Sequence, residues 1–223
     1  MTPSIRADWL IPTALIALSI VPVVAGITRL VWLASGVEIT PENARFFADP
    51  VPVVTHIVSV ILFSILGAFQ FSSGVRRQRP NWHRIAGRLL VPCGLVAALS
   101  GLWLTEFYPP TENDGLLLYV FRVAFGWVMI LCLILGMFAI VQRDIAQHRA
   151  WMMRSYAIGL GAGTQAFTFI LWFVLVGSPD ELARALLMGT GWIINVTVVE
   201  WILQIRPLQS TRYLGAAATE TAG

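Results

Sequence analysis

The stretch LLLYVFRVAFGWVMILCLILGMFAIV, from Leu116 to Val141, decides the fold of this chain because it holds a single charged residue, Arg122. An apolar run of this length fits a helix that crosses a bilayer, which needs about 20 apolar residues. Five further apolar runs lie before and after it. They cover residues 9–32, 53–71, 85–104, 151–176 and 185–205.

The composition of the whole chain also indicates a membrane protein. The 223 residues are 57% hydrophobic and 12% charged, whereas soluble domains carry about 25% charged residues. Only helices and closed barrels satisfy their own backbone in lipid, and continuous rather than alternating apolar runs favour helices. The sequence therefore predicts an all-α, polytopic bundle of six transmembrane helices. We expect one transmembrane domain over residues 1–208 and a short, polar, disordered tail over residues 209–223.

The distribution of arginine predicts the orientation of the bundle. All 15 basic residues are arginine, and positively charged loops mark the cytoplasmic side of a membrane protein. Arginines gather near both termini and in alternate loops, while acidic residues dominate the opposite loops; Arg29 runs against this pattern. Both termini and the tail should therefore be cytoplasmic. The net charge of +3 then reflects the arginines that set the topology, which can also contact anionic lipid. It gives no reason to expect a nucleic-acid partner.

Polar side chains inside the apolar runs are costly in lipid and mark candidate functional positions. Toward the outer side, Glu106 and Arg122 are expected to form an ion pair between the third and fourth helices. Toward the inner side, Arg154 and Glu200 are expected to pair between the fifth and sixth helices. His56 stands alone near the outer side, where a hydrogen bond to a neighbouring helix is the simplest expectation.

Two similar patterns open the third and fifth runs: Trp82-His83-Arg84-Ile85-Ala86-Gly87-Arg88 and His148-Arg149-Ala150-Trp151-Met152-Met153-Arg154. Each follows a Gly-x-Phe segment and a basic loop, which suggests two similar helical hairpins. Two imidazoles at one depth on different helices are what axial ligation of haem iron requires. They also suit a proton-responsive gate or simple anchoring at the membrane interface.

In the haem interpretation, the adjacent guanidiniums would contact the haem propionates. These are the guanidiniums of Arg84, Arg88, Arg149 and Arg154. We expect His83 and His148 to lie near each other. His56 should be roughly 20 Å away, since about 15 residues at 1.5 Å each separate it from the inner end of its helix.

The stretch from His56 through Gly67-Ala68-Phe69-Gln70 to Arg88, followed by His148 to Ala157, resembles a bacterial membrane-protein family known as domain of unknown function 2306 (DUF2306). Ala68 and Leu90 stand where the family commonly has proline and tyrosine. The resemblance implies a multi-pass protein of the bacterial inner membrane. It also implies a characteristic polar set: His56, Gln70, His83, Arg84, Arg88, His148, Arg149 and Arg154.

Three classes of function remain open at this point. The first is a haem-binding or redox protein, with haem b as the cofactor and a membrane redox partner. The second is a small-molecule or proton-coupled transporter, and the third is a non-catalytic scaffold; a homo-oligomer is compatible with each. Phosphate-binding, zinc-protease and serine-hydrolase motifs are absent from the sequence, and the sequence does not decide whether the protein is an enzyme.

Overall fold

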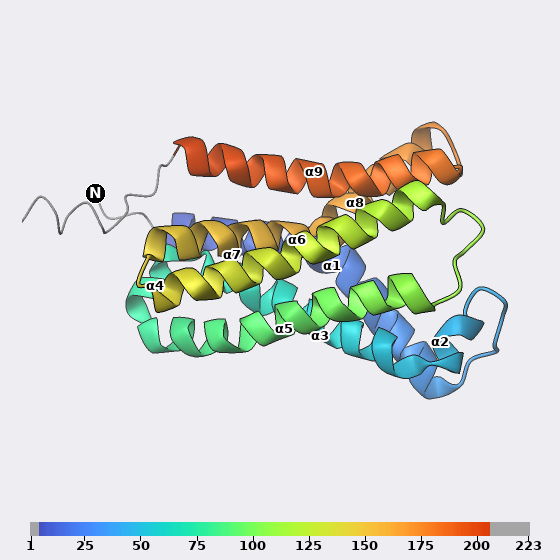
Figure 1. Cartoon of the computed structure of the whole chain (residues 1–223), viewed down its shortest axis with the longest axis horizontal. Coiled ribbons are helices and arrows are strands. Elements are labelled where there is room, and N and C mark those ends of the chain that lie inside the picture. Colours follow the sequence, from blue (N-terminus) through green and yellow to red (C-terminus); the bar gives the residue numbers. More distant parts are fainter. Residues whose placement is uncertain (1–4, 206–223) are drawn as a thin grey trace, which may run out of the picture.

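The computed structural model describes residues 5–205, which form an elongated bundle of helices (Figure 1). Six segments within this range are long and apolar enough to cross a membrane, as the sequence predicts. Five are single helices: α1 Ile5–Ser35, α3 Pro50–Gln70, α5 Pro80–Phe107, α6 Leu116–Val141 and α9 Glu181–Ile205. The fifth segment consists of α7 Ile145–Gly159 and α8 Gly161–Leu175, and the short helices α2 Ala44–Ala48 and α4 Ser73–Gln78 lie in connections. The predicted tail at residues 209–223 falls outside the described residues.

Two helical hairpins form the centre of the bundle. The most extensive contacts join α3 with α5 and α6 with α7, which are the two hairpins that the internal repeat predicts. Phe63 of α3, Leu90 of α5, Leu133 of α6 and Tyr156 of α7 meet in the buried core. The Tyr156 hydroxyl donates a 2.7 Å hydrogen bond to the carbonyl oxygen of Ser64, so this buried polar group is satisfied.

The fifth membrane segment is broken at Leu160, where the sequence predicts one continuous apolar run. Close packing accompanies the break. A Cβ atom on Gly161 would lie 2.3 Å from the Trp192 side chain, and one on Gly163 would lie 2.4 Å from the carbonyl oxygen of Leu18. Glycine therefore lets α9 and α1 approach α8 closely, as small residues do between membrane helices.

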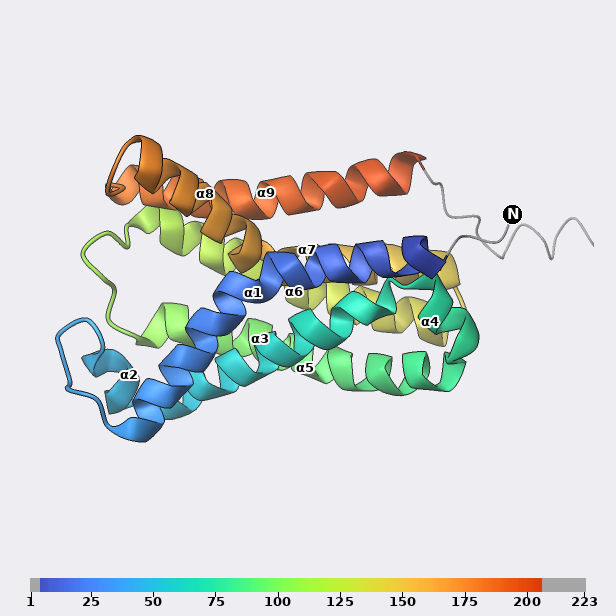
Figure 2. The same ribbon diagram turned by 180° about the vertical axis from the view of Figure 1, so that it is seen from behind.

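Helix α1 runs along the back of the bundle and contacts α3 and α8 (Figure 2). It carries Pro12 and Pro22 within its length, and Figure 2 shows that it bends. Proline removes a backbone hydrogen bond and displaces the preceding turn, so bending is expected in such a helix.

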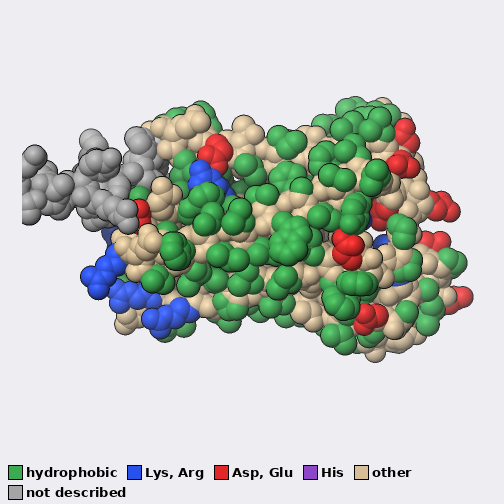
Figure 3. All heavy atoms as spheres, in the orientation of Figure 1, with side chains coloured by type: hydrophobic (Ala, Val, Ile, Leu, Met, Phe, Trp, Pro, Cys, Tyr) green, Lys and Arg blue, Asp and Glu red, His purple; other side chains and the backbone are tan. Residues whose placement is uncertain are grey.

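The two ends of the bundle differ in charge (Figure 3). The arginine-rich end holds α4 and the first turns of α5 and α7. The acidic end holds the connections at residues 36–49, 108–115 and 176–180, where Asp and Glu predominate. The loops that the sequence assigns to opposite sides of a membrane thus lie at opposite ends of the molecule.

Candidate functional site

His83 and His148 both lie at the arginine-rich end, in the first turns of α5 and α7. These two helices contact each other, and each histidine is the fourth residue of its helix. His56 lies near the start of α3 at the acidic end. The structure therefore places two of the three histidines at one end of the bundle and the third at the other end, as expected from the sequence.

The His148 ring is held in one orientation by a backbone carbonyl. Its Nδ1 lies 2.8 Å from the carbonyl oxygen of Gly136 in α6. Because a carbonyl oxygen only accepts hydrogen bonds, Nδ1 carries a proton, and in the neutral ring the lone pair lies on Nε2. In histidines that ligate metals, the ring nitrogen that does not bind the metal typically donates a hydrogen bond of this kind.

Two buried polar atoms without a hydrogen-bond partner lie at the same end of the bundle. They are Nδ1 of His83 and Nε2 of Gln70, the last residue of α3. Gln70 Oε1 lies 4.0 Å from the position of a Cβ atom on Gly87, one turn beyond His83 on the same face of α5. Such unpaired atoms are rare in folded proteins. We call Gln70, His83 and His148 the inner polar site.

The arginines predicted to surround this site fall into two groups. Arg84, Arg88 and Arg149 have exposed side chains at the arginine-rich end. Arg154 instead forms a bidentate ion pair with Glu200 of α9, with Nε–Oε1 and Nη2–Oε2 distances of 2.6 and 2.9 Å. The predicted Arg154–Glu200 pair is therefore confirmed, and Arg154 already has a carboxylate partner.

The predicted ion pair between Glu106 and Arg122 is wrong. Arg122 bonds Asp114, with Nη1–Oδ2 and Nη2–Oδ1 distances of 3.2 and 3.3 Å. Arg184 of α9 contacts the same carboxylate at 3.1 Å. The exposed Glu106 accepts a 2.8 Å hydrogen bond from the Tyr119 hydroxyl. Asp114 lies in the connection just before α6, two turns from Arg122. Its carboxylate, rather than that of Glu106, therefore pairs with the Arg122 guanidinium.

Asp114 is the centre of the charge cluster at the acidic end. Its side chain is only 7% exposed. Burial of the carboxyl opposes its ionisation, but the hydrogen bond and charge of Arg122, together with Arg184, outweigh this and hold the pKa of Asp114 below its ordinary value. The sequence does not mark Asp114 as a site because this residue lies outside the apolar runs.

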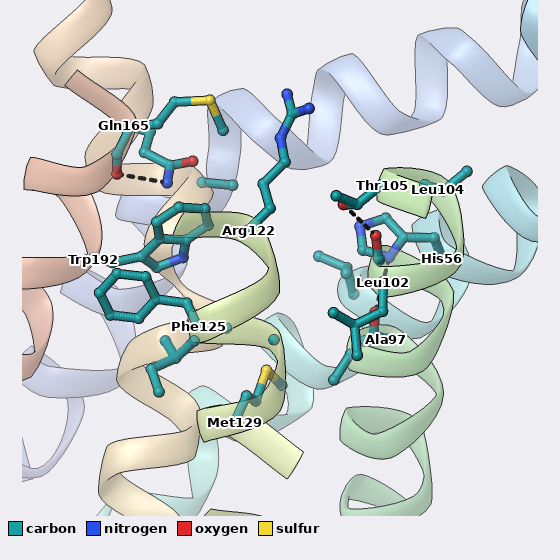
Figure 4. Close-up of a pocket in the computed structure, with 18 of the residues that line it drawn as sticks. His56, Ala97, Leu102, Leu104, Thr105, Arg122, Phe125, Met129, Gln165 and Trp192 are labelled. Atoms are coloured by element: carbon teal, nitrogen blue, oxygen red, sulfur yellow. Dashed lines mark hydrogen bonds between the residues drawn. The ribbon is translucent and has the colours of Figure 1, made fainter. Parts of the chain in front are cut away.

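His56 faces a cavity at the acidic end (Figure 4). Its Nδ1 lies 3.0 Å from the carbonyl oxygen of Ala97 and 3.1 Å from the Ser100 hydroxyl. The expected hydrogen bond to a neighbouring helix is thus confirmed, and it leaves the lone pair on Nε2. The cavity has a volume of about 390 Å³ and reaches from Asp114 at the acidic end to Met129 within the bundle.

Residues 5–205 contain no cluster of three or more His, Cys, Asp or Glu side chains that could hold a metal ion. A metal centre built only from protein ligands therefore has no candidate in this part of the chain. Haem is different because the macrocycle supplies four ligands and the protein needs to supply one or two.

Comparison with known protein families gives one match. The model of a family described as "Predicted membrane protein (DUF2306)" matches residues 53–203. Comparisons with curated proteins and with solved structures give no match. The match covers more than half of the chain and includes both histidine-bearing helix starts, so this chain belongs to the DUF2306 family of predicted membrane proteins.

Proposed function

We propose that this protein is a redox-linked protein of the bacterial inner membrane, in which His83 and His148 hold haem b at the cytoplasmic side. The observation that carries the proposal is the placement of two imidazoles at the same end of the bundle, each in the first turn of one of two helices that contact each other. Imidazole is a common protein ligand of haem b, so His83 and His148 would hold the group through their ring nitrogens.

The residues at the inner polar site fit this group chemically. His148 offers Nε2 because the Gly136 carbonyl holds the proton on Nδ1. His83 and Gln70 each have a buried polar atom without a partner, which is expected of side chains that complete their contacts on a bound group. Arg84, Arg88 and Arg149 are exposed at the same end of the bundle, and guanidiniums are the groups that pair best with carboxylates such as the propionates.

Bound haem would supply one-electron transfer, while the chain itself supplies ligation, orientation and charge. The Gly136 carbonyl fixes the tautomer and ring plane of His148. The Arg154–Glu200 pair ties α7 to α9, which keeps the helix carrying His148 in place. A redox partner would approach from the cytoplasm, at the arginine-rich end.

Titration of the purified protein with hemin tests the proposal. We expect the wild type to show saturable binding with a shifted Soret band, and His83→Ala and His148→Ala each to abolish the low-spin spectrum. His56→Ala is the matched control because His56 lies at the opposite end, and it should bind hemin like the wild type. Equal binding by all four proteins would show that the ligands lie elsewhere.

A further inference from the structure

A cavity at the acidic end is lined by side chains of two kinds (Figure 4). Its mouth holds Arg45, Tyr108, Asp114 and Arg122, and a second hollow of about 290 Å³ shares these four residues. Its deeper part is mainly apolar and aromatic, and includes Phe63, Phe125, Met129 and Trp192. The main cavity, at about 390 Å³, is within the range of small-molecule sites, roughly 300–1,000 Å³.

The mouth of the cavity has more guanidinium groups than nearby buried carboxylates. Arg122 and Arg184 share the single carboxylate of Asp114. Glu106 does not line the main cavity but lines the second hollow, where it is exposed and bonded to Tyr119, and the exposed Glu181 lies against Gly115. The mouth of the main cavity is therefore lined by two guanidiniums, of Arg45 and Arg122, and one carboxylate, of Asp114.

Arg45 is the guanidinium best placed to meet a ligand. Its Nη1 donates a 2.9 Å hydrogen bond to the carbonyl oxygen of Pro109, and its plane lies 4.7 Å from the Phe46 ring centre. Its Nε is buried and has no partner. These contacts orient the group at the edge of both hollows and leave its buried Nε without a partner, and guanidinium donors match carboxylate oxygens well.

The interior of the cavity offers few polar groups. His56 presents the lone pair of Nε2, since Nδ1 is bonded to the Ala97 carbonyl. Gln165 donates through Nε2 to the carbonyl oxygen of Met188 at 3.0 Å. The break at Leu160 lies beside this space, because Gly159 and Ala162 line the cavity. Broken membrane helices often line ligand sites of transporters.

We infer that this cavity binds an amphipathic carboxylate, with the anionic head on Arg45 and Arg122 and the apolar body against Phe125, Met129 and Trp192. This inference is independent of haem binding, because the inner polar site lies at the other end of the bundle. Two classes of ligand combine a carboxylate with an apolar body in this way: a fatty acid from the bilayer and a water-soluble aryl-alkyl acid.

Tryptophan quenching by a brominated probe tests the inference. Protein in lipid nanodiscs is titrated with 11-bromoundecanoate and with 11-bromoundecanol, which has the same chain without the charge. We expect the carboxylate alone to give a saturable quenching component, and Trp192→Phe to remove that component. Displacement by 4-phenylbutyrate would identify water-soluble acids as ligands, whereas no displacement would restrict the site to long acyl chains.

Variants at the mouth and in the interior complete the test. Arg45→Gln should weaken carboxylate binding about tenfold, the effect of losing one charge-assisted hydrogen bond, and Arg45→Lys should retain more of it. Ala162→Leu, which fills the cavity from an exposed position, should reduce binding without altering the mouth. Arg76→Gln, at the opposite end, is the control. Equal quenching by acid and alcohol, or unchanged affinity in both Arg45→Gln and Ala162→Leu, would overturn the inference.

Discussion

At the scale of single residues, most charged side chains near the apolar segments are held by a specific neighbour. Arg154 pairs with Glu200 and also lies over the Trp151 ring, 4.7 Å from its centre. Arg29 lies over Phe46, 4.1 Å from its centre. Arg29 runs against the arginine pattern of the loops, and its aromatic partner gives it a local role that does not depend on topology.

The Arg154–Glu200 pair should couple α7 to α9 energetically. We expect Glu200→Gln to lower the free energy of unfolding by about 1 kcal/mol, because the pair is partly exposed and membrane helix contacts of this kind are modest. The double variant Arg154→Glu/Glu200→Arg, in which the two charges are exchanged, should recover part of the lost free energy of unfolding. Thermal unfolding in detergent of the single and double variants measures the coupling, and strictly additive effects would show that the pair contributes nothing.

The Asp114 cluster should make stability depend on pH. The pKa of Asp114 in the folded protein lies below its ordinary value of 3.8, so the stabilisation is complete above that value and is lost as the pH falls through the folded-state pKa. Asp114→Asn should therefore melt at a lower temperature than the wild type at pH 7. The difference should narrow below about pH 4. A difference that stays constant between pH 7 and pH 3 would contradict this role.

At the scale of helices, the sequence predicts the membrane segments better than the contacts that each segment makes with its neighbours. Long apolar runs define all six membrane segments because hydrocarbon thickness sets the length of a spanning helix. The break at Leu160 is not visible in that pattern, since it depends on close packing against Trp192 and Leu18. Asp114 was missed for a similar reason, because a loop residue acquires its partners only when α6 and α9 come together.

Glycines at helix contacts provide a direct test of this packing. Gly163→Ala should destabilise the protein by about 1–3 kcal/mol, since the added Cβ would lie 2.4 Å from the backbone oxygen of Leu18. Gly87→Ala is the matched control, because its Cβ would meet only Gln70 Oε1 at 4.0 Å. Alanine favours a helix over glycine, so this control should be neutral or slightly stabilising. Equal melting temperatures for the two variants would contradict the close approach of α1 and α8.

At the scale of the whole molecule, the two ends of the bundle are chemically distinct. The inner polar site contains histidines and an amide beside exposed arginines, and the acidic end contains a cavity with a guanidinium mouth. The sequence predicts the separation of His56 from His83 and His148, because residue number along a helix fixes depth. It does not predict the cavity, which is formed by side chains from several helices.

The predicted cytoplasmic location of the arginine-rich end is testable with reporter fusions. Fusions after Gly223 should be active with a cytoplasmic reporter, and insertions between Gly36 and Asp49 should be active with a periplasmic one. The same reporters in exchanged positions serve as the control. A periplasmic signal from the carboxyl terminus would reverse the orientation and place the inner polar site outside the cell.

The reduced-minus-oxidised visible spectrum of the protein, purified in mild detergent from cells supplied with a haem precursor, tests the central claim most directly. Ligation by His83 and His148 predicts a low-spin haem b spectrum, present in the His56→Ala protein and absent from the His148→Ala protein. A colourless protein that also fails to take up added hemin would contradict the claim.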